Sequence, residues 1–142
     1  MSAAAPPERP PAAEPGPTLF IDRDLWSRRL DDALRHAGIP FVAHRDLFAD
    51  DLPDEQWIAE VGRRGLVVLT RDQQIRRRPN ELAAVRAARI RLFALTSGNL
   101  SAAEAASLCV AAWPAIVRAV ARHPAPALFS ITRGGEVRWL KT

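Results

Sequence analysis

The sequence predicts a three-layer α/β fold, in which a mainly parallel central sheet is flanked by helices. Four short apolar runs, at residues 18–21, 39–43, 66–70 and 90–95, have the length and flanking polar residues of buried strands. Stretches with apolar residues at helical spacing separate them, and a longer helical stretch follows the last. Regular alternation of this kind is typical of a parallel sheet with right-handed helical crossovers.

The domain organisation is simple. Residues 1–17 contain six of the twelve prolines and no apolar periodicity, which predicts a disordered tail rich in proline and alanine. Residues 18–142 remain for one domain, which is long enough to bury a core without disulfides.

The first strand, residues 18–21 (TLFI), ends at Asp22. The helix that follows presents one apolar face and stops at Gly38. The residues of that face are Trp26, Leu30, Ala33, Leu34 and Ala37. Residues 39–43 (IPFVA) form the second predicted strand, whose first residues are poor ladder donors because of Pro40.

The middle of the chain holds the clearest strand. An acidic loop, residues 44–56, leads into a helix that we expect Asp51 to cap, with Pro53 in its first turn and Gly62 and Gly65 at its end. Its apolar face begins with Trp57, Ile58 and Val61. The strand at residues 66–70 (LVVLT) is continuous and rich in β-branched residues, so it should be central in the sheet.

The last part of the chain adds two helices and three strands. A basic connection and a helix over about residues 80–88 lead to the strand at 90–95. Ser101 caps a long alanine-rich helix, which we expect Pro114 to kink and which ends by His123-Pro124. Residues 127–132 and 136–140 read as a terminal hairpin at the sheet edge.

Composition narrows the function classes. The single cysteine, Cys109, and the three scattered histidines show no zinc-ligand spacing, and Cys109 is expected to be a small buried hydrophobe. No secretory leader or membrane-spanning apolar stretch is evident, which predicts a cytoplasmic protein with no membrane partner. The tail carries a net charge of −1, which leaves +5 on the remaining residues and favours a polyanionic partner.

Acidic residues should meet at one edge of the predicted sheet. Asp22 and Asp72 directly follow strands, Asp54 and Glu55 open a helix, and Asn99 follows the fourth strand. Strand ends and helix starts share the carboxyl edge, where open α/β sheets bind their ligands. Two carboxylates about 5 Å apart would repel each other by roughly 3 kcal/mol at an effective dielectric constant of 20. A bound Mg²⁺ or Mn²⁺ ion would offset this repulsion.

Basic residues lie beside these acids in the sequence. The run Arg76-Arg77-Arg78 follows Asp72 closely, and Arg71 precedes it. With Asn99, these side chains are candidates for contacts to the phosphate backbone of a nucleic acid. The tryptophans at 26, 57 and 113 fall on apolar helix faces and are expected in the core rather than as base-stacking platforms.

The order of these motifs resembles a known family. The stretch LPDEQWIAEVGRRGLVVLTRD, residues 52–72, resembles the part of PIN-domain nucleases in which an Asp opens a helix and a strand runs into a T-x-D motif. With FIDRDL, LTRDQQIRRRP and LTSGNLS, the chain is similar to the compact PIN-like branch associated with VapC-type toxins.

The resemblance implies a metal-dependent ribonuclease, often the toxin of a toxin-antitoxin pair, with an antitoxin protein as partner. A second copy of the chain is a further possible partner. By motif, the resemblance implies that Asp22, Asp54 and Asp72 are the metal ligands. Many family members have another acid between the first two, and since no counterpart is evident here, Glu55 is assigned as its substitute with Asn99 as a neighbour.

Two other functions remain open from the sequence. A PIN-like scaffold could bind RNA or a partner protein without cleaving, which the missing acid would favour. The TLFIDRDL segment also resembles the first motif of haloacid-dehalogenase-like phosphatases. Leu25 stands where that motif has a small residue, and the single lysine, Lys141, is not convincing as the downstream lysine that such enzymes need.

Overall fold

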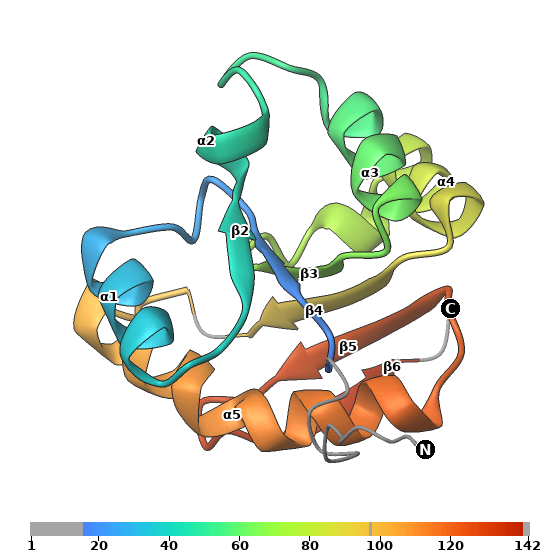
Figure 1. Ribbon diagram of the computed structural model, residues 1–142. Coiled ribbons are helices and arrows are strands. Elements are labelled where there is room, and N and C mark those ends of the chain that lie inside the picture. Colours follow the sequence, from blue (N-terminus) through green and yellow to red (C-terminus); the bar gives the residue numbers. More distant parts are fainter. Residues whose placement is uncertain (1–15, 97, 141–142) are drawn as a thin grey trace, which may run out of the picture.

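The computed structural model describes residues 16–96 and 98–140. The predicted tail therefore lies outside the described residues except for Gly16 and Pro17, and its disorder stays a prediction. The described part forms a twisted sheet with helices on both faces, so the fold class expected from the sequence is confirmed (Figure 1).

The sheet has six strands in the order β2-β1-β3-β4-β5-β6. Strands β1 to β5 pair in parallel, and β6 runs antiparallel to β5 at the edge, as the predicted terminal hairpin requires. The predicted central strand, β3, lies between β1 and β4. The strands are β1 (Leu19–Ile21), β2 (Phe41–Ala43), β3 (Val67–Thr70), β4 (Arg91–Leu95), β5 (Ala127–Ile131) and β6 (Val137–Leu140).

The strand order creates a switch point between β1 and β3. The chain leaves β1 toward β2 on one side and leaves β3 toward β4 on the other, so no crossover covers the gap between the two carboxyl ends. This is the position at which doubly wound sheets of order 2-1-3-4-5 bind ligands. Ile21 is in register with Leu69, which keeps the two strand ends level.

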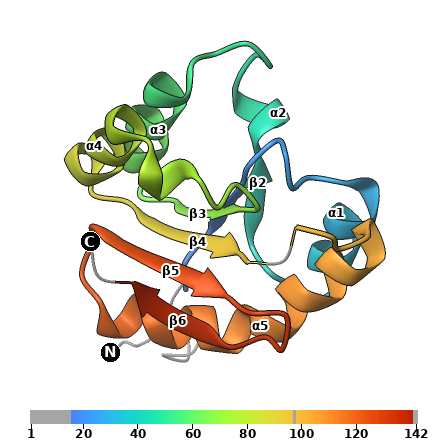
Figure 2. The ribbon, with the colours of Figure 1, turned by 180° about the vertical axis from the view of Figure 1, so that it is seen from behind.

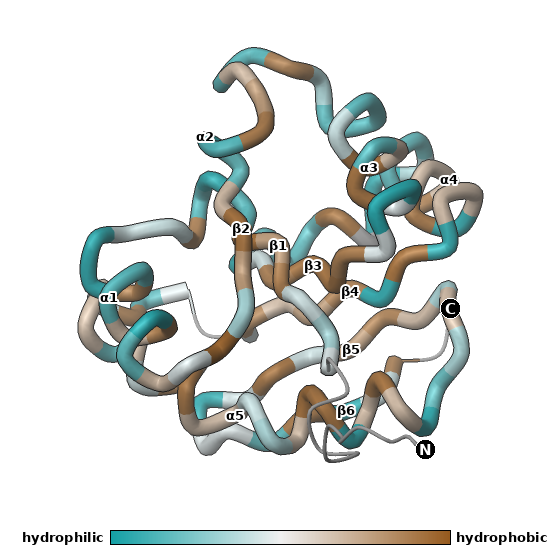
Figure 3. The backbone as a smooth tube through the Cα atoms, viewed as in Figure 1, coloured by the Kyte–Doolittle hydropathy of each residue, from teal (hydrophilic) through white to brown (hydrophobic). Residues whose placement is uncertain are grey.

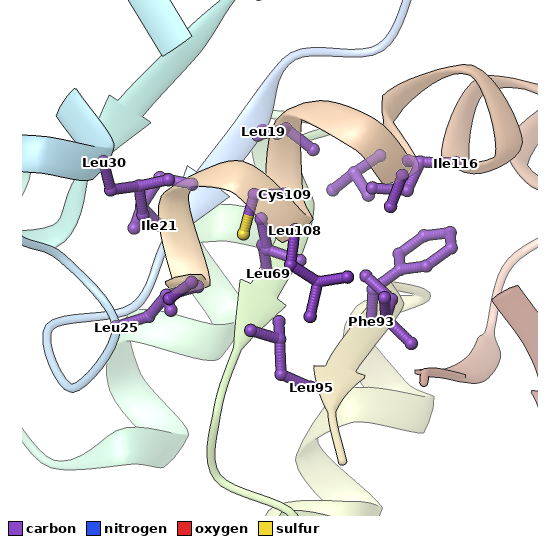
Figure 4. Packing of buried hydrophobic residues seen from close by; sticks show 14 of the residues in the cluster. Leu19, Ile21, Leu25, Leu30, Leu69, Phe93, Leu95, Leu108, Cys109 and Ile116 are labelled. Atoms are coloured by element: carbon purple, nitrogen blue, oxygen red, sulfur yellow. The ribbon is translucent and has the colours of Figure 1, made fainter. Parts of the chain in front are cut away.

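Helices cover the two faces in pairs (Figures 1 and 2). Helices α1 (Arg28–His36) and α5 (Ala102–Arg122) pack together on one face, and α3 (Asp54–Arg63) and α4 (Pro79–Ala88) pack together on the other. Hydrophobic residues line the sheet between them (Figure 3). Figure 4 shows α5 placing Leu108, Cys109 and Ile116 against Leu69 and Phe93. Cys109 is 1% exposed, which confirms its prediction as a buried hydrophobe, and burial raises its pKa to about 12.

Two short helices occupy segments that the sequence analysis treated as loops. They are α2 (His44–Leu47) and the 3-10 helix η3 (Ile75–Arg77). Asp46 supports α2 by accepting a hydrogen bond from the Ala43 backbone N–H at 3.0 Å. One turn is too short for apolar periodicity to reveal, so only this local capping could have signalled it.

The predicted start of α3 is wrong, and its predicted end is right only at Gly65, which follows the C-cap residue Arg64 with a φ of +70°. Pro53, and not Asp51, is the residue before α3, and its side chain cannot cap. Gly62 lies inside α3 and does not end it. A Cβ atom at Gly62 would lie 2.5 Å from the Ala88 carbonyl oxygen, so glycine is needed there for the close approach of α3 and α4.

Helix α5 runs from Ala102 to Arg122 with Pro114 inside it. Contrary to the expectation from the sequence, α5 is long and apolar enough to cross a membrane by length and composition. A helix that packs in the core of a folded domain passes the same test, and one such helix is weak evidence. In this fold α5 lies against α1 and the sheet, with seven of its residues buried.

His44 is the buried polar group that lacks partners in the described part of the chain. It is 0% exposed, and neither ring nitrogen has a hydrogen-bond partner. Its ring packs among Phe20, Phe48 and Trp57, with centroid distances of 6.0, 5.4 and 6.1 Å. Burial and the nearby charge of Arg23 lower the pKa of His44. The fold therefore holds a neutral imidazole that it cannot easily protonate.

This imidazole should make folding sensitive to acid. Its pKa is below 6.5 in the fold, so the unfolded chain binds the extra proton and His44's contribution is lost as pH falls below about 6.5. The unfolding free energy of the wild type should fall between pH 7 and pH 5. We expect His44→Leu to reduce the slope of this fall by up to about 1.4 kcal/mol per pH unit. Denaturant titrations at several pH values measure this slope. His36→Gln, which replaces an exposed histidine, is the control. Parallel curves for wild type and His44→Leu would contradict this assignment.

Candidate active site

Asp22 ends β1 at the switch point and is the most buried acid of this edge, at 7% exposed. Its Oδ2 accepts a hydrogen bond from the Thr70 hydroxyl at 2.8 Å, and its Oδ1 accepts one from the Arg23 backbone N–H, also at 2.8 Å. Burial raises the pKa of Asp22 in spite of these bonds, and the negative charge of Asp54 adds to the effect. The two hydrogen bonds thus fix the orientation of the Asp22 carboxylate, but its negative charge is poorly compensated.

Asp24, which was not among the acids predicted to meet at this edge, joins Asp22. The two carboxyl groups lie within hydrogen-bonding reach of each other, and Asp24 Oδ1 is 3.4 Å from the Thr70 hydroxyl. Loss of solvent around the Asp24 carboxyl, with the charges of Asp22 and Asp72, raises its pKa to about 7. The D-x-D spacing after a strand was the available signal, since the turn at residues 23–25 folds the second acid back onto the first.

Asp72 follows β3 on the other side of the switch point. Its backbone N–H donates to the Thr70 hydroxyl at 3.0 Å, so one threonine links Asp72 to Asp22. Both of its carboxylate oxygens bind the guanidinium of Arg78, at 2.9 and 3.1 Å. Asp72 Oδ1 also accepts the Gln74 backbone N–H at 3.0 Å, which fixes the turn after β3.

Asp54 and Glu81 form a second pair of acids, brought together by the packing of α3 against α4. Asp54 opens α3, and its Oδ1 accepts a hydrogen bond from the Trp57 indole at 2.8 Å. Glu81, in the first turn of α4, lies within hydrogen-bonding reach of Asp54, and burial raises its pKa. Arg78 contacts Glu81 at 2.6 Å and so bridges it to Asp72. Sequence reasoning missed Glu81, because only the α3–α4 contact brings it to this edge.

The other predicted site residues lie around this group with fewer contacts to it. Glu55 is exposed in the first turn of α3, and within the described chain no hydrogen bond or ion pair ties it to the acids above. Arg71 donates to the Leu100 carbonyl oxygen at 3.0 Å. Arg77 and Asn99 are exposed. The backbone of Arg76 lies in η3, and its side chain lies outside what the structure describes.

The acids fit a hard divalent cation by their donor chemistry. Three carboxyl groups of these two pairs, those of Asp22, Asp24 and Glu81, have raised pKa values. Mg²⁺ or Mn²⁺ with oxygen ligands would supply the positive charge that stabilises their ionised forms. In residues 16–96 and 98–140, however, no three acids, histidines or cysteines are already grouped to hold one ion. Asp72 is instead paired with Arg78. Binding would therefore require side-chain rotation at this edge.

Comparison with known proteins places the fold in a family. A family model described as "PIN like domain" matches residues 17–97, more than half of the chain and the segment that carries Asp22, Asp54 and Asp72. The chain belongs to the PIN-like domain family. The family predicted from the sequence motifs is thereby confirmed, and with it the three-layer fold.

A curated relative extends the likeness beyond the matched segment. The chain is 30% identical over 126 residues to a Mycobacterium tuberculosis H37Rv protein named "Putative ribonuclease VapC45", covering 86% of this PIN-like chain and 91% of the relative. The aligned length shows that the likeness also takes in much of the C-terminal part of the fold, outside residues 17–97. No solved structure matches the chain.

Proposed function

We propose that this PIN-like chain is a metal-dependent ribonuclease that hydrolyses RNA phosphodiester bonds and acts as the toxin of a toxin-antitoxin pair in the cytoplasm. The observation that carries the proposal is the close carboxyl pair of Asp22 and Asp24 at the β1/β3 switch point, where the charge of Asp54 acts on Asp22 and that of Asp72 on Asp24. The relative named as a ribonuclease supports the substrate class. The partner would be an antitoxin protein, with a homodimer as the second possible assembly.

The residues have distinct proposed roles. Asp22, Asp54 and Asp72 would hold Mg²⁺ or Mn²⁺ with Asp24, and a bound divalent ion supplies water activation and charge neutralisation at the phosphate. Thr70 orients Asp22 and the backbone of Asp72, and Trp57 orients Asp54. Glu55 remains a proposed fourth acid by its position in the helix, although Asp24 has the stronger contacts.

Positive charge for the RNA backbone would come from Arg71, Arg76, Arg77 and Arg78, with Asn99 as a polar contact. Of these, Arg77, Arg78 and Asn99 are exposed. Arg78 is engaged by Asp72 and Glu81, so it would reach a phosphate only by leaving one of them. Phosphate contacts of this kind position an RNA without reading its sequence.

The test is cleavage of single-stranded RNA by wild type and Asp72→Asn, each with Mn²⁺, Mg²⁺ or EDTA. We expect wild type to cleave with a divalent ion, and Asp72→Asn to cleave at least about 100-fold more slowly. Loss of a group that only supports a metal ligand lowers activity by about 10- to 100-fold, and loss of a ligand carboxylate should lower it at least as much. Asp32→Asn, an exposed acid on α1, is the matched control and should cleave normally.

The alternatives have separate outcomes in the same assay. Equal cleavage by both proteins, or cleavage in EDTA, would overturn the metal mechanism. RNA binding without cleavage would favour the PIN-like scaffold. Hydrolysis of small phosphomonoesters in place of RNA would favour the haloacid-dehalogenase-like phosphatase.

A further inference from the structure

A cavity of about 550 Å³ opens beside the acids, between the β1–α1 turn and α2. Its lining residues are Arg23, Trp26, Arg45, Phe48, Ala49 and Asp50. Arg23 is the next residue after Asp22, and consecutive Cα atoms are about 3.8 Å apart. Because α2 directly follows β2, the far wall also lies at the carboxyl edge of the sheet. The cavity and the proposed cleavage site therefore share the carboxyl edge of the sheet, where the β1–α1 turn contributes residues to both.

Trp26 and Arg45 form a stacked pair in this cavity, which the prediction of Trp26 as a core residue did not anticipate. The Arg45 guanidinium carbon lies 4.6 Å from the centre of the Trp26 ring system. The ring is held from its other end, because its indole N–H donates to Asp31 Oδ2 at 3.1 Å. Asp31 is itself paired with Arg35 at 2.6 Å.

The opposite wall is held by buried packing. Phe48 packs against the buried rings of Phe20 and His44, with centroid distances of 5.9 and 5.4 Å. Asp46 caps α2 through the Ala43 N–H. Contacts outside the cavity thus fix both of its walls. Few side chains would have to be immobilised when a ligand binds, which lowers the entropic cost of binding.

We propose that this cavity binds one nucleobase of a single-stranded RNA, next to the phosphate that the acidic edge cleaves. The proposal rests on the proposed ribonuclease function and adds a recognition site to it. Unpaired bases stack on aromatic rings and on arginine guanidinium planes, and the stacked pair of Trp26 and Arg45 offers both kinds of surface. Asp50 offers an acceptor to a base amine, and Arg23 and Arg45 match the charge of the flanking phosphates.

The size and chemistry of the cavity fit this occupant. A volume of about 550 Å³ lies within the roughly 300–1,000 Å³ usual for small-molecule sites. Bases within a duplex are stacked and paired, so a pocket at the protein surface selects an unpaired base. A second copy of the chain would bring a further Arg23 and Arg45 against the same two cations, which like-charge repulsion opposes.

The experiment measures the affinity of a fluorescently labelled ten-nucleotide single-stranded RNA by anisotropy, in EDTA so that binding is separated from cleavage. We expect Trp26→Ala and Arg45→Ala to weaken binding by roughly 5- to 100-fold, the range for loss of one base stack. Arg45→Lys keeps the charge but not the planar group and should recover little of the loss. Trp26→Phe keeps an aromatic face and should recover most of it, which also guards against unfolding of Trp26→Ala.

Matched controls come from elsewhere in the chain. Arg138→Ala removes the same charge from an exposed guanidinium on β6, which pairs with Glu136 at 2.9 Å and lies outside the cavity lining. Trp139→Ala removes an aromatic side chain that is 52% exposed on β6. Both controls should bind RNA as wild type does. Equal losses in Arg138→Ala and Arg45→Ala would mean general electrostatic attraction and would overturn the proposal.

Failure of this inference is distinguishable from failure of the proposed function. If wild type cleaves RNA while Trp26→Ala and Arg45→Ala bind it normally, the base site is wrong and the ribonuclease stands. If wild type neither binds nor cleaves RNA, both fail. Competition by poly-glutamate as effective as competition by unlabelled RNA would assign the cavity to an acidic peptide and would also overturn the proposal.

Discussion

Asp22→Asn should lower the rate of RNA cleavage by about 100-fold or more, while the fold stays as stable as wild type or becomes more stable. The activity loss follows from removal of a carboxylate at the centre of the proposed metal group. The stability gain follows from burial, which raises the pKa of Asp22 and so makes its charge at neutral pH costly to the fold. An asparagine can still meet Thr70 and the Arg23 N–H without that charge.

The combination of the two readouts separates a functional acid from a structural one. Asp46→Ala is the control for an acid that serves the fold, because Asp46 caps α2 and its loss should cost about 1 kcal/mol of unfolding free energy with normal cleavage. Single-turnover cleavage rates and urea denaturation measure both properties on each protein. Marked destabilisation of Asp22→Asn with intact cleavage would show that Asp22 serves the fold and not the chemistry.

Gly62→Ala should destabilise the protein by about 2 kcal/mol, in spite of the better helix propensity of alanine. The new Cβ would lie 2.5 Å from the Ala88 carbonyl oxygen and 2.7 Å from the Ala88 Cβ, so the α3 and α4 backbones must separate. Overpacking of this kind costs about 1–3 kcal/mol and occasionally more. The propensity gain is at most about 1 kcal/mol, so the clash should prevail.

Thermal unfolding measures this effect, with an expected fall in Tm of roughly 6–10 °C. Gly134→Ala is the control, since its nearest neighbour would be the Thr132 hydroxyl at 3.9 Å and no clash results. A rise in the Tm of Gly62→Ala would mean that the α3–α4 approach is looser than described. The same helix pair sets the distance from Asp54 to Glu81, so a loss of stability here should also lower activity.

Much of the fold was predictable because its strands are short, apolar and separated by helices of clear periodicity. The strand at residues 66–70 is an example, since a β-branched run buried on both faces can hardly be anything else. The errors fall where the deciding contact is distant in sequence. Gly62 looked like a helix stop, and its true reason, the backbone of Ala88, is visible only once α3 and α4 are packed.

The site divides along the same line. Asp22 and Asp72 follow from topology alone, because parallel strand ends must share an edge. Asp24 was not predicted, since a sequence does not show that the turn after β1 folds its carboxyl group back onto Asp22. Glu81 reaches Asp54 through the α3–α4 contact, which local spacing does not encode, although its ion pair with Arg78 has the i,i+3 spacing of neighbours on a helix.

The central claim is that these acids form one divalent-cation site at the β1/β3 switch point. The most direct test is anomalous diffraction at the manganese edge from crystals grown with MnCl₂. We predict a peak within about 2.0–2.4 Å of carboxylate oxygens from at least two of Asp22, Asp24, Asp54 and Asp72, with Arg78 moved away from Asp72 where Asp72 is a ligand. A peak elsewhere on the protein, or none at saturating Mn²⁺, would contradict the account.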